Sequence, residues 1–148
     1  MPKVLISDKM DPKAAQIFRE RGVEVDEITG KTPEELAAII GEFARWHAEQ
    51  HQVARIVQYE FRHLSPDHQR EVLTLRREID GVVERIIAEG VASGDFHVTD
   101  TRATALAALS LVVDVARWYH PGIKRTTPEQ IGRTYATLAL RLVGARED

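Results

Sequence analysis

The chain has 148 residues, a formal net charge of -3 and no cysteine. This length is typical of a single domain with a real core. The charge argues against a surface that coats nucleic acid, because phosphate binding depends on clustered Lys and Arg. The absence of cysteine excludes disulfides, thiolate catalysis and thiolate metal sites. The N-terminus lacks the apolar run of a signal peptide, so we expect a cytoplasmic protein.

Short apolar runs and one helix signal occupy the start of the chain. Val4 to Ile6 is an apolar run, Asp11-Pro12 is a helix start, and residues 23–28 alternate apolar and acidic side chains. This pattern predicts a strand, a helix and a second strand. Two parallel strands cannot cover both of their faces, so we expect a small β-α-β extension and not a complete α/β domain.

From residue 32 onward the apolar residues follow the three-and-four spacing of amphipathic helices. Two capping boxes, Thr32 with Glu35 and Thr127 with Gln130, mark helix starts, and Ser65 marks another. The chain is therefore predicted to be mainly α-helical, with a break near residue 51. The predicted helices cover residues 32–50, 53–64, 66–90, 102–119 and 128–143.

Residues 102–122 form the most apolar stretch of the chain, interrupted by Asp114 and Arg117. As a helix this stretch is apolar on two sides, and residues 128–143 also carry two apolar stripes. A helix that is apolar on two sides must be buried on both. The stretch is too short and too charged to span a membrane. Two such helices predict a homodimer made by four helices, two from each chain.

The predicted dimer interface lies on these last two helices. Asp114 and Arg117 must find partners there, because an unpaired buried charge is costly. An ion pair at the dimer interface is the favoured interpretation, and contact of Arg117 with a ligand carboxylate or phosphate is the alternative. The interface candidates are Leu111, Asp114, Val115, Trp118, Tyr135, Leu138 and Leu142.

Residues 43–145 resemble the C-terminal domain of TetR-type transcriptional regulators. The stretches that carry the resemblance are FARWHAEQHQVARIVQYEFRHLSPDHQREVLTLRREID, IIAEGVASGDF, ALSLVVDVARWYHPG and TPEQIGRTYATLALRLVG, in this order. The branch they resemble is associated with lipid, steroid or acyl-CoA catabolism. The resemblance implies a helical bundle over residues 42–148 that binds a small lipophilic or acyl-CoA-like effector and dimerises through its last two long helices. The candidate pocket residues are Trp46, Tyr59, Arg62, Leu75, Arg117 and Trp118.

Residues 2–42 resemble the opening of D-3-phosphoglycerate dehydrogenase. The stretch is PKVLISDKMDPKAAQIFRERGVEVDEITGKTPEELAAIIGE. The glycine-rich dinucleotide fingerprint and the Arg, Glu and His catalytic set of that family are absent from the sequence. The TetR-like stretch likewise has no preceding helix-turn-helix that would read DNA. We therefore expect a chimera of residues 1–41 and 42–148, with no direct DNA binding and no membrane association.

Two histidines one helical turn apart, His47 and His51, have a legitimate metal-ligand spacing. No third ligand is evident, so the alternative of two histidines near a helix end is favoured. No catalytic residue, metal or cofactor is predicted, and the chain is not expected to be an enzyme. The favoured function is the effector-binding and dimerisation module of a TetR-like regulator. The alternatives are a non-functional or engineered chimera and a remnant of a hydroxyacid dehydrogenase.

Overall fold

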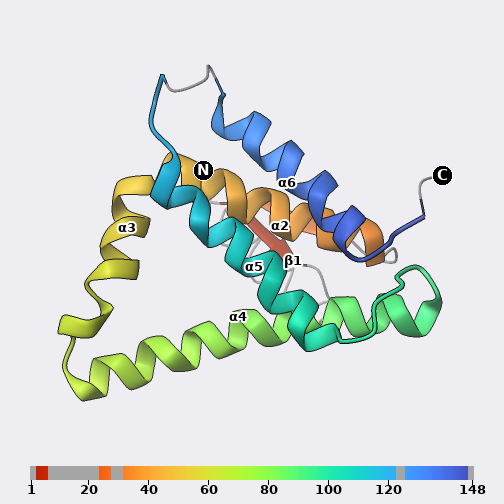
Figure 1. Ribbon diagram of the computed structural model, residues 1–148, viewed down its shortest axis with the longest axis horizontal. Coiled ribbons are helices and arrows are strands. Elements are labelled where there is room, and N and C mark those ends of the chain that lie inside the picture. Colours follow the sequence, from red (N-terminus) through yellow and green to blue (C-terminus); the bar gives the residue numbers. More distant parts are fainter. Residues whose placement is uncertain (1–2, 7–23, 28–31, 123–125, 147–148) are drawn as a thin grey trace.

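The computed structural model of the chain describes residues 3–6, 24–27, 32–122 and 126–146 (Figure 1). The described part consists of helices, one short 3-10 helix and two short strands. Their bounds are β1 Lys3–Ile6, β2 Glu24–Glu27, α2 Thr32–Glu49, α3 His51–Tyr59, η1 Phe61–His63, α4 Pro66–Ser93, α5 Thr101–Trp118 and α6 Pro128–Leu142.

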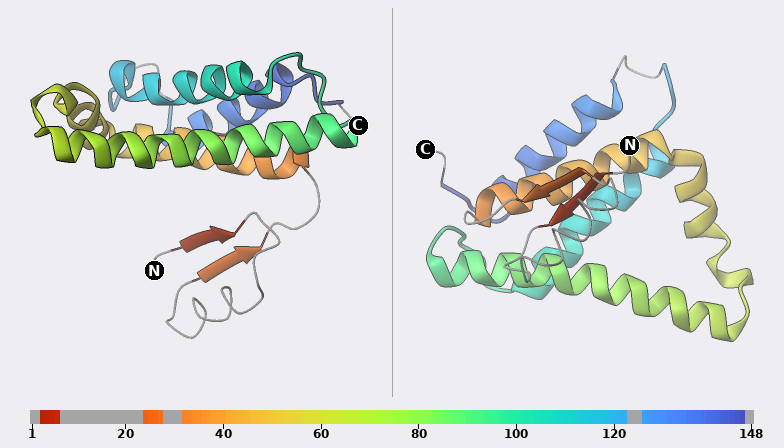
Figure 2. Two further views of the ribbon diagram at one scale, coloured as in Figure 1. Left: turned by 90° about the horizontal axis from the view of Figure 1, so that it is seen from below. Right: turned by 180° about the vertical axis from the view of Figure 1, so that it is seen from behind.

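The two strands pair in parallel at the start of the chain. Lys3 lies opposite Glu24, and Ile6 lies opposite Glu27. Figure 2 shows this pair to one side of the helices. The helix predicted between the strands falls outside the described residues, so the β-α-β extension stays a prediction.

The helix boundaries follow the signals in the sequence. At the start of α6 the Thr127 hydroxyl accepts from the Gln130 amide, and the Gln130 side chain accepts from the Thr127 amide, which confirms the predicted capping box. Ser65 accepts from the amide of His68 at the start of α4. That helix ends at Gly94, whose φ of 84° is readily adopted only by glycine.

Helix α2 lies at the centre of the fold and contacts α4, α5 and α6. One side of α2 faces these neighbours, because Leu36, Ile40 and Ala44 are all buried. The core also takes side chains from the other long helices and from the connectors. These residues are Val83, Ile86, Ile87, Phe96, Ala105, Ala108, Leu109, Val112, Val115, Tyr119, Ile131, Ala139 and Val143.

Two glycines allow α2 and α6 to cross at close range. A Cβ atom added at Gly132 would lie 2.8 Å from the carbonyl oxygen of Gly41, and one added at Gly41 would lie 3.1 Å from the carbonyl oxygen of Gly132. The nearest atoms belong to the backbone, so no side-chain rotation could relieve the contact. Glycine is therefore required at Gly132, whereas a side chain at Gly41 would need the facing backbone to shift slightly.

Helices α3, α4 and α5 form the three sides of a triangle in Figure 1. The helix is interrupted at Gln50, between α2 and α3, which is next to the interruption predicted near residue 51. α3 then leads away from α2 and reaches the start of α4 through η1 (Figure 1). α3 keeps contact with α5 along this path.

Candidate ligand cavity

A cavity of about 500 Å³ lies among α2, α3, α4 and α5. Cavities of this size and character are typical of small-molecule sites. Five polar side chains line it, namely His47, Gln58, Arg76, Asp80 and Ser110. The remaining lining is apolar or aromatic and consists of Phe43, Trp46, Ala54, Val57, Ile79, Leu106, Leu109 and Val113.

Two side chains of α3 hold this helix against the end of α5. Arg55 donates to the carbonyl oxygens of Ala116 at 2.6 Å and Tyr119 at 2.8 Å. Gln58 donates from Nε2 to the carbonyl of Val113 at 3.0 Å. Carbonyls in the last turn of a helix lack helical partners, and a cation there also complements the helix dipole. These bonds keep α3 in place as one wall of the cavity.

His47 is the most buried polar side chain of the cavity, with 5% of its surface exposed. Its Nδ1 lies 2.8 Å from the carbonyl oxygen of Phe43, and a carbonyl can only accept, so Nδ1 carries the hydrogen. Burial lowers the pKa of His47 below its usual value of 6.5 and so favours the neutral ring. Nε2 is then a hydrogen-bond acceptor, and no described residue donates to it.

The other polar groups come from α4 and α5. Ser110 donates its hydroxyl hydrogen to the carbonyl of Leu106 at 2.7 Å. Arg76 and Asp80 lie one turn apart on α4, and no ion pair joins them in the described part of the chain. The Arg76 guanidinium carbon lies 4.7 Å from the centre of the Phe61 ring, in a cation–π contact.

Lowering the pH should destabilise the folded chain through His47. Because its folded-state pKa lies below 6.5, the unfolded chain binds more protons between these two values. The free energy of unfolding should therefore fall as the pH drops below about 6.5, by at most about 1.4 kcal/mol per pH unit from this residue. Urea unfolding between about pH 7.5 and about pH 5.5 measures this slope.

The matched variants for this test are His47→Phe and His63→Asn. His47→Phe should flatten the pH dependence, whereas His63→Asn should leave it close to that of the unmodified chain because the His63 side chain is exposed. An equal slope in His47→Phe and the unmodified chain would contradict the assignment.

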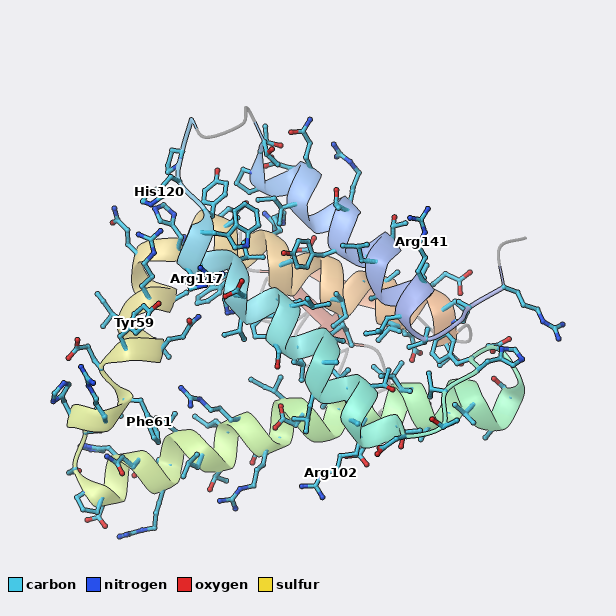
Figure 3. All side chains as sticks on the ribbon, in the orientation of Figure 1. Tyr59, Phe61, Arg102, Arg117, His120 and Arg141 are labelled. Carbon is cyan, nitrogen blue, oxygen red and sulfur yellow. The ribbon has the colours of Figure 1, made fainter. Side chains whose placement is uncertain are left out.

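One of the six predicted pocket residues, Trp46, lines the cavity. Tyr59, Arg62, Arg117 and Trp118 are exposed and are not part of its lining. Figure 3 shows Tyr59 on α3 and Arg117 at the end of α5. The sixth residue, Leu75, lies in a separate hollow on α4, together with Asp67, Arg70, Glu71 and Thr74.

The predicted interface residues divide into an exposed and a buried group. Leu111 and Trp118 on α5 and Leu138 and Leu142 on α6 are large apolar side chains that remain exposed in the protomer. Val115 differs, because it is fully buried in the protomer's own core, and Tyr135 is partly buried against that core.

No described helix has an apolar stretch long enough to cross a membrane.

Asp114 and Arg117 pair with each other on the surface of α5. Arg117 donates from Nε to Oδ1 at 2.6 Å and from Nη2 to Oδ2 at 2.8 Å. These hydrogen bonds lower the pKa of Asp114 below its usual range. The two residues pair one turn apart within the same helix and at an exposed position, and the location of this pair at a dimer interface stays a prediction.

The two histidines with metal-ligand spacing are each tied to a helix carbonyl. His51 Nδ1 lies 2.9 Å from the carbonyl oxygen of Ala48, as His47 Nδ1 does from that of Phe43. The part of the chain that the structure describes contains no group of three or more potential metal-ligating side chains. The arrangement corresponds to two histidines at a helix end.

The pocket residues predicted from the sequence did not include the polar lining residues Gln58, Arg76, Asp80 and Ser110. The signal in the sequence that could have found them is the spacing of these residues along their helices. Leu106, Ser110 and Val113 share one face of α5, and Arg76 and Asp80 share one face of α4. This spacing identifies a common face, but only the tertiary arrangement shows that the faces meet at a cavity.

Two solved structures are similar to this chain. One is a bacterial regulatory protein in the tetR family from Rhodococcus RHA1, with 39% identity and a TM-score of 0.75 over 80% of this chain and 62% of that chain. The other is a transcriptional regulator of the TetR/AcrR family from Thermobifida fusca YX-ER1, with 26% identity and a TM-score of 0.68 over 81% of this chain and 62% of that chain. The chain thus spans less than two thirds of either protein. No curated protein matches it.

Residues 29–143 match the family model described as the Tetracyclin repressor-like, C-terminal domain. The match covers all the described helices and begins ahead of the domain boundary expected near residue 42. The cavity and the exposed apolar faces of α5 and α6 therefore lie within the matched region. The chain belongs to the TetR family, and residues 29–143 form its Tetracyclin repressor-like C-terminal domain.

Proposed function

We propose that this chain is the effector-binding and dimerisation module of a TetR-family transcriptional regulator. The observation that carries the proposal is the cavity among α2, α3, α4 and α5, with its largely apolar lining. Its volume of about 500 Å³ falls within the range of small-molecule sites, roughly 300–1,000 Å³. Proteins of the family typically form homodimers and bind small-molecule effectors, and they are generally not enzymes.

The exposed apolar side chains of α5 and α6 support the dimerisation role. Leu111 and Trp118 belong to one of these helices, and Leu138 and Leu142 to the other. Contiguous apolar side chains on a surface typically mark an interaction site. A four-helix contact between two copies would cover both helices in each chain.

The effector is proposed to be lipophilic, because most of the lining side chains are apolar or aromatic, among them Phe43, Leu109 and Val113. An acyl-CoA-like molecule would place its acyl chain here and its nucleotide outside the cavity. The proposal assigns no DNA contact to the described helices, in keeping with the formal net charge of -3.

Filling the cavity should abolish effector binding. Val57 lies on α3, lines the cavity and is 52% exposed, so Val57→Trp should place an indole ring in the site without removing a core side chain. We expect the neutral fluorescent probe N-phenyl-1-naphthylamine to bind the unmodified chain saturably and Val57→Trp at least about tenfold more weakly. Fluorescence titration measures both affinities.

Val53→Trp is the matched control. Val53 lies one turn earlier on the same helix, is 48% exposed and does not line the cavity. This variant should bind the probe as the unmodified chain does. Equal binding by all three proteins would place the probe elsewhere, and no binding by the unmodified chain would contradict the proposed function.

A further inference from the structure

We propose that the cavity selects a neutral, mainly apolar molecule that carries a hydroxyl or amine hydrogen-bond donor, in preference to a carboxylate or another anion. The proposal rests on the proposed function and names the chemical class of its effector. It is carried by the arrangement of His47, Gln58 and Ser110 around one apolar cavity.

Each of these three side chains donates a hydrogen bond to a backbone carbonyl. His47 pairs its Nδ1 hydrogen with the carbonyl of Phe43, and Ser110 gives its hydroxyl hydrogen to Leu106. Gln58 gives an amide hydrogen to Val113. The groups left without a partner among the described residues are three acceptors, namely His47 Nε2, Gln58 Oε1 and the lone pairs of Ser110 Oγ, and one donor, the second amide hydrogen of Gln58 Nε2.

The three side chains differ in burial, because His47 is buried, Gln58 is half-buried and Ser110 is exposed. His47 comes from α2, Gln58 from α3 and Ser110 from α5, so the acceptors belong to three different walls. An apolar ligand would displace water from them without replacing its hydrogen bonds, whereas an anion would bring further lone pairs against them. A hydroxyl or amine group satisfies an acceptor directly.

The charged lining residues give an anion little net attraction. Arg76 is the cation of the lining, and Asp80 lies one turn away from it on the same helix. The Arg76 guanidinium is also stacked on Phe61, which does not line the cavity. The indole of Trp46 adds one neutral donor to the lining. A bound carboxylate would therefore gain one cation and the neutral donors of Trp46 and Gln58, but it would face the Asp80 carboxylate and three acceptors.

Three probes of one shape test the proposal by isothermal titration calorimetry on the intact chain. 2-Naphthol offers a donor, 2-methoxynaphthalene has the same ring without a donor, and 2-naphthoate is an anion. We expect 2-naphthol to bind about tenfold more tightly than either of the others, which is the worth of one good hydrogen bond. Equal affinities for 2-naphthol and 2-methoxynaphthalene, or tightest binding of 2-naphthoate, would overturn the proposal and leave the proposed function intact. Binding of none of the probes would contradict both.

His47→Phe and Ser110→Ala identify the acceptors. The first removes Nε2 and keeps a ring of similar size, and the second removes an exposed hydroxyl whose loss leaves the core untouched. At least one variant should reduce the advantage of 2-naphthol to within about twofold while keeping the affinity for 2-methoxynaphthalene. Val53→Trp, outside the cavity, should keep the full advantage. Retention of the full advantage in both acceptor variants would overturn the assignment of these acceptors.

Discussion

Replacing Leu138 with glutamate is expected to convert a dimer into a folded monomer. Leu138 lies on α6, is 42% exposed in the protomer and belongs to the apolar face that we propose a partner chain covers. A glutamate within the proposed contact would bury an unpaired charge, which costs several kcal/mol. The dissociation constant should rise by about a thousandfold or more. Light scattering measures the mass, and circular dichroism shows whether the helices persist.

Ile56→Glu is the control for this variant. It makes the same kind of change at a position on α3 that is 61% exposed and lies outside both the cavity lining and the proposed interface. Its mass should equal that of the unmodified chain. If Leu138→Glu remains dimeric, the α5–α6 face is not the interface.

Gly132→Leu should destabilise the fold by about 3 kcal/mol or more. Any side chain at this position would meet the carbonyl of Gly41 at 2.8 Å, so α2 and α6 would have to move apart. Because α2 also contacts α4 and α5, this movement would disturb the core around Ile40 and Ile131. Urea denaturation monitored by circular dichroism measures the loss.

Gly81→Leu is the control for Gly132→Leu, because the same substitution at this position should not destabilise the fold. Gly81 lies within α4, and an added Cβ atom would meet no atom within 4 Å. Leucine favours a helix over glycine, so this variant should be as stable as the unmodified chain or more stable by up to about 1 kcal/mol. Equal stability of Gly132→Leu and Gly81→Leu would show that the helix crossing tolerates a side chain.

The helices could be predicted from the sequence because their signals are local. The capping box at Thr127 and the Ser65-Pro66 start each act within one turn, and the structure contains both. The helix expected over residues 66–90 continues to Ser93 and is capped by Gly94. The pairing of Asp114 with Arg117 could also be predicted, because it depends only on the spacing of the two residues along a helix.

The cavity could not be predicted in detail because its lining depends on where helices turn. The helix predicted over residues 53–64 ends at Tyr59, and Arg62 lies in the 3-10 turn that follows. Tyr59 is one residue beyond Gln58, a rotation of about 100° around the helix axis. That rotation separates an exposed ring from a side chain that lines the cavity.

Burial within the protomer also could not be separated from burial in a dimer by spacing alone. Val115 and Leu111 lie one turn apart in the same apolar helix, yet Val115 is fully buried and Leu111 is exposed. An apolar stripe shows that a side chain avoids water but does not show which chain covers it. The packing of α5 against α2 decides between the two.

Backbone amide chemical shifts, measured with and without saturating 2-naphthol, test most directly whether the cavity is the effector site. The largest changes should occur at residues that line it on three helices, including His47, Val57 and Ser110, and the changes along α6 should be small. Largest changes at Leu138 and Leu142 would instead place the probe on the exposed apolar face of α6 and would contradict the assignment of the cavity.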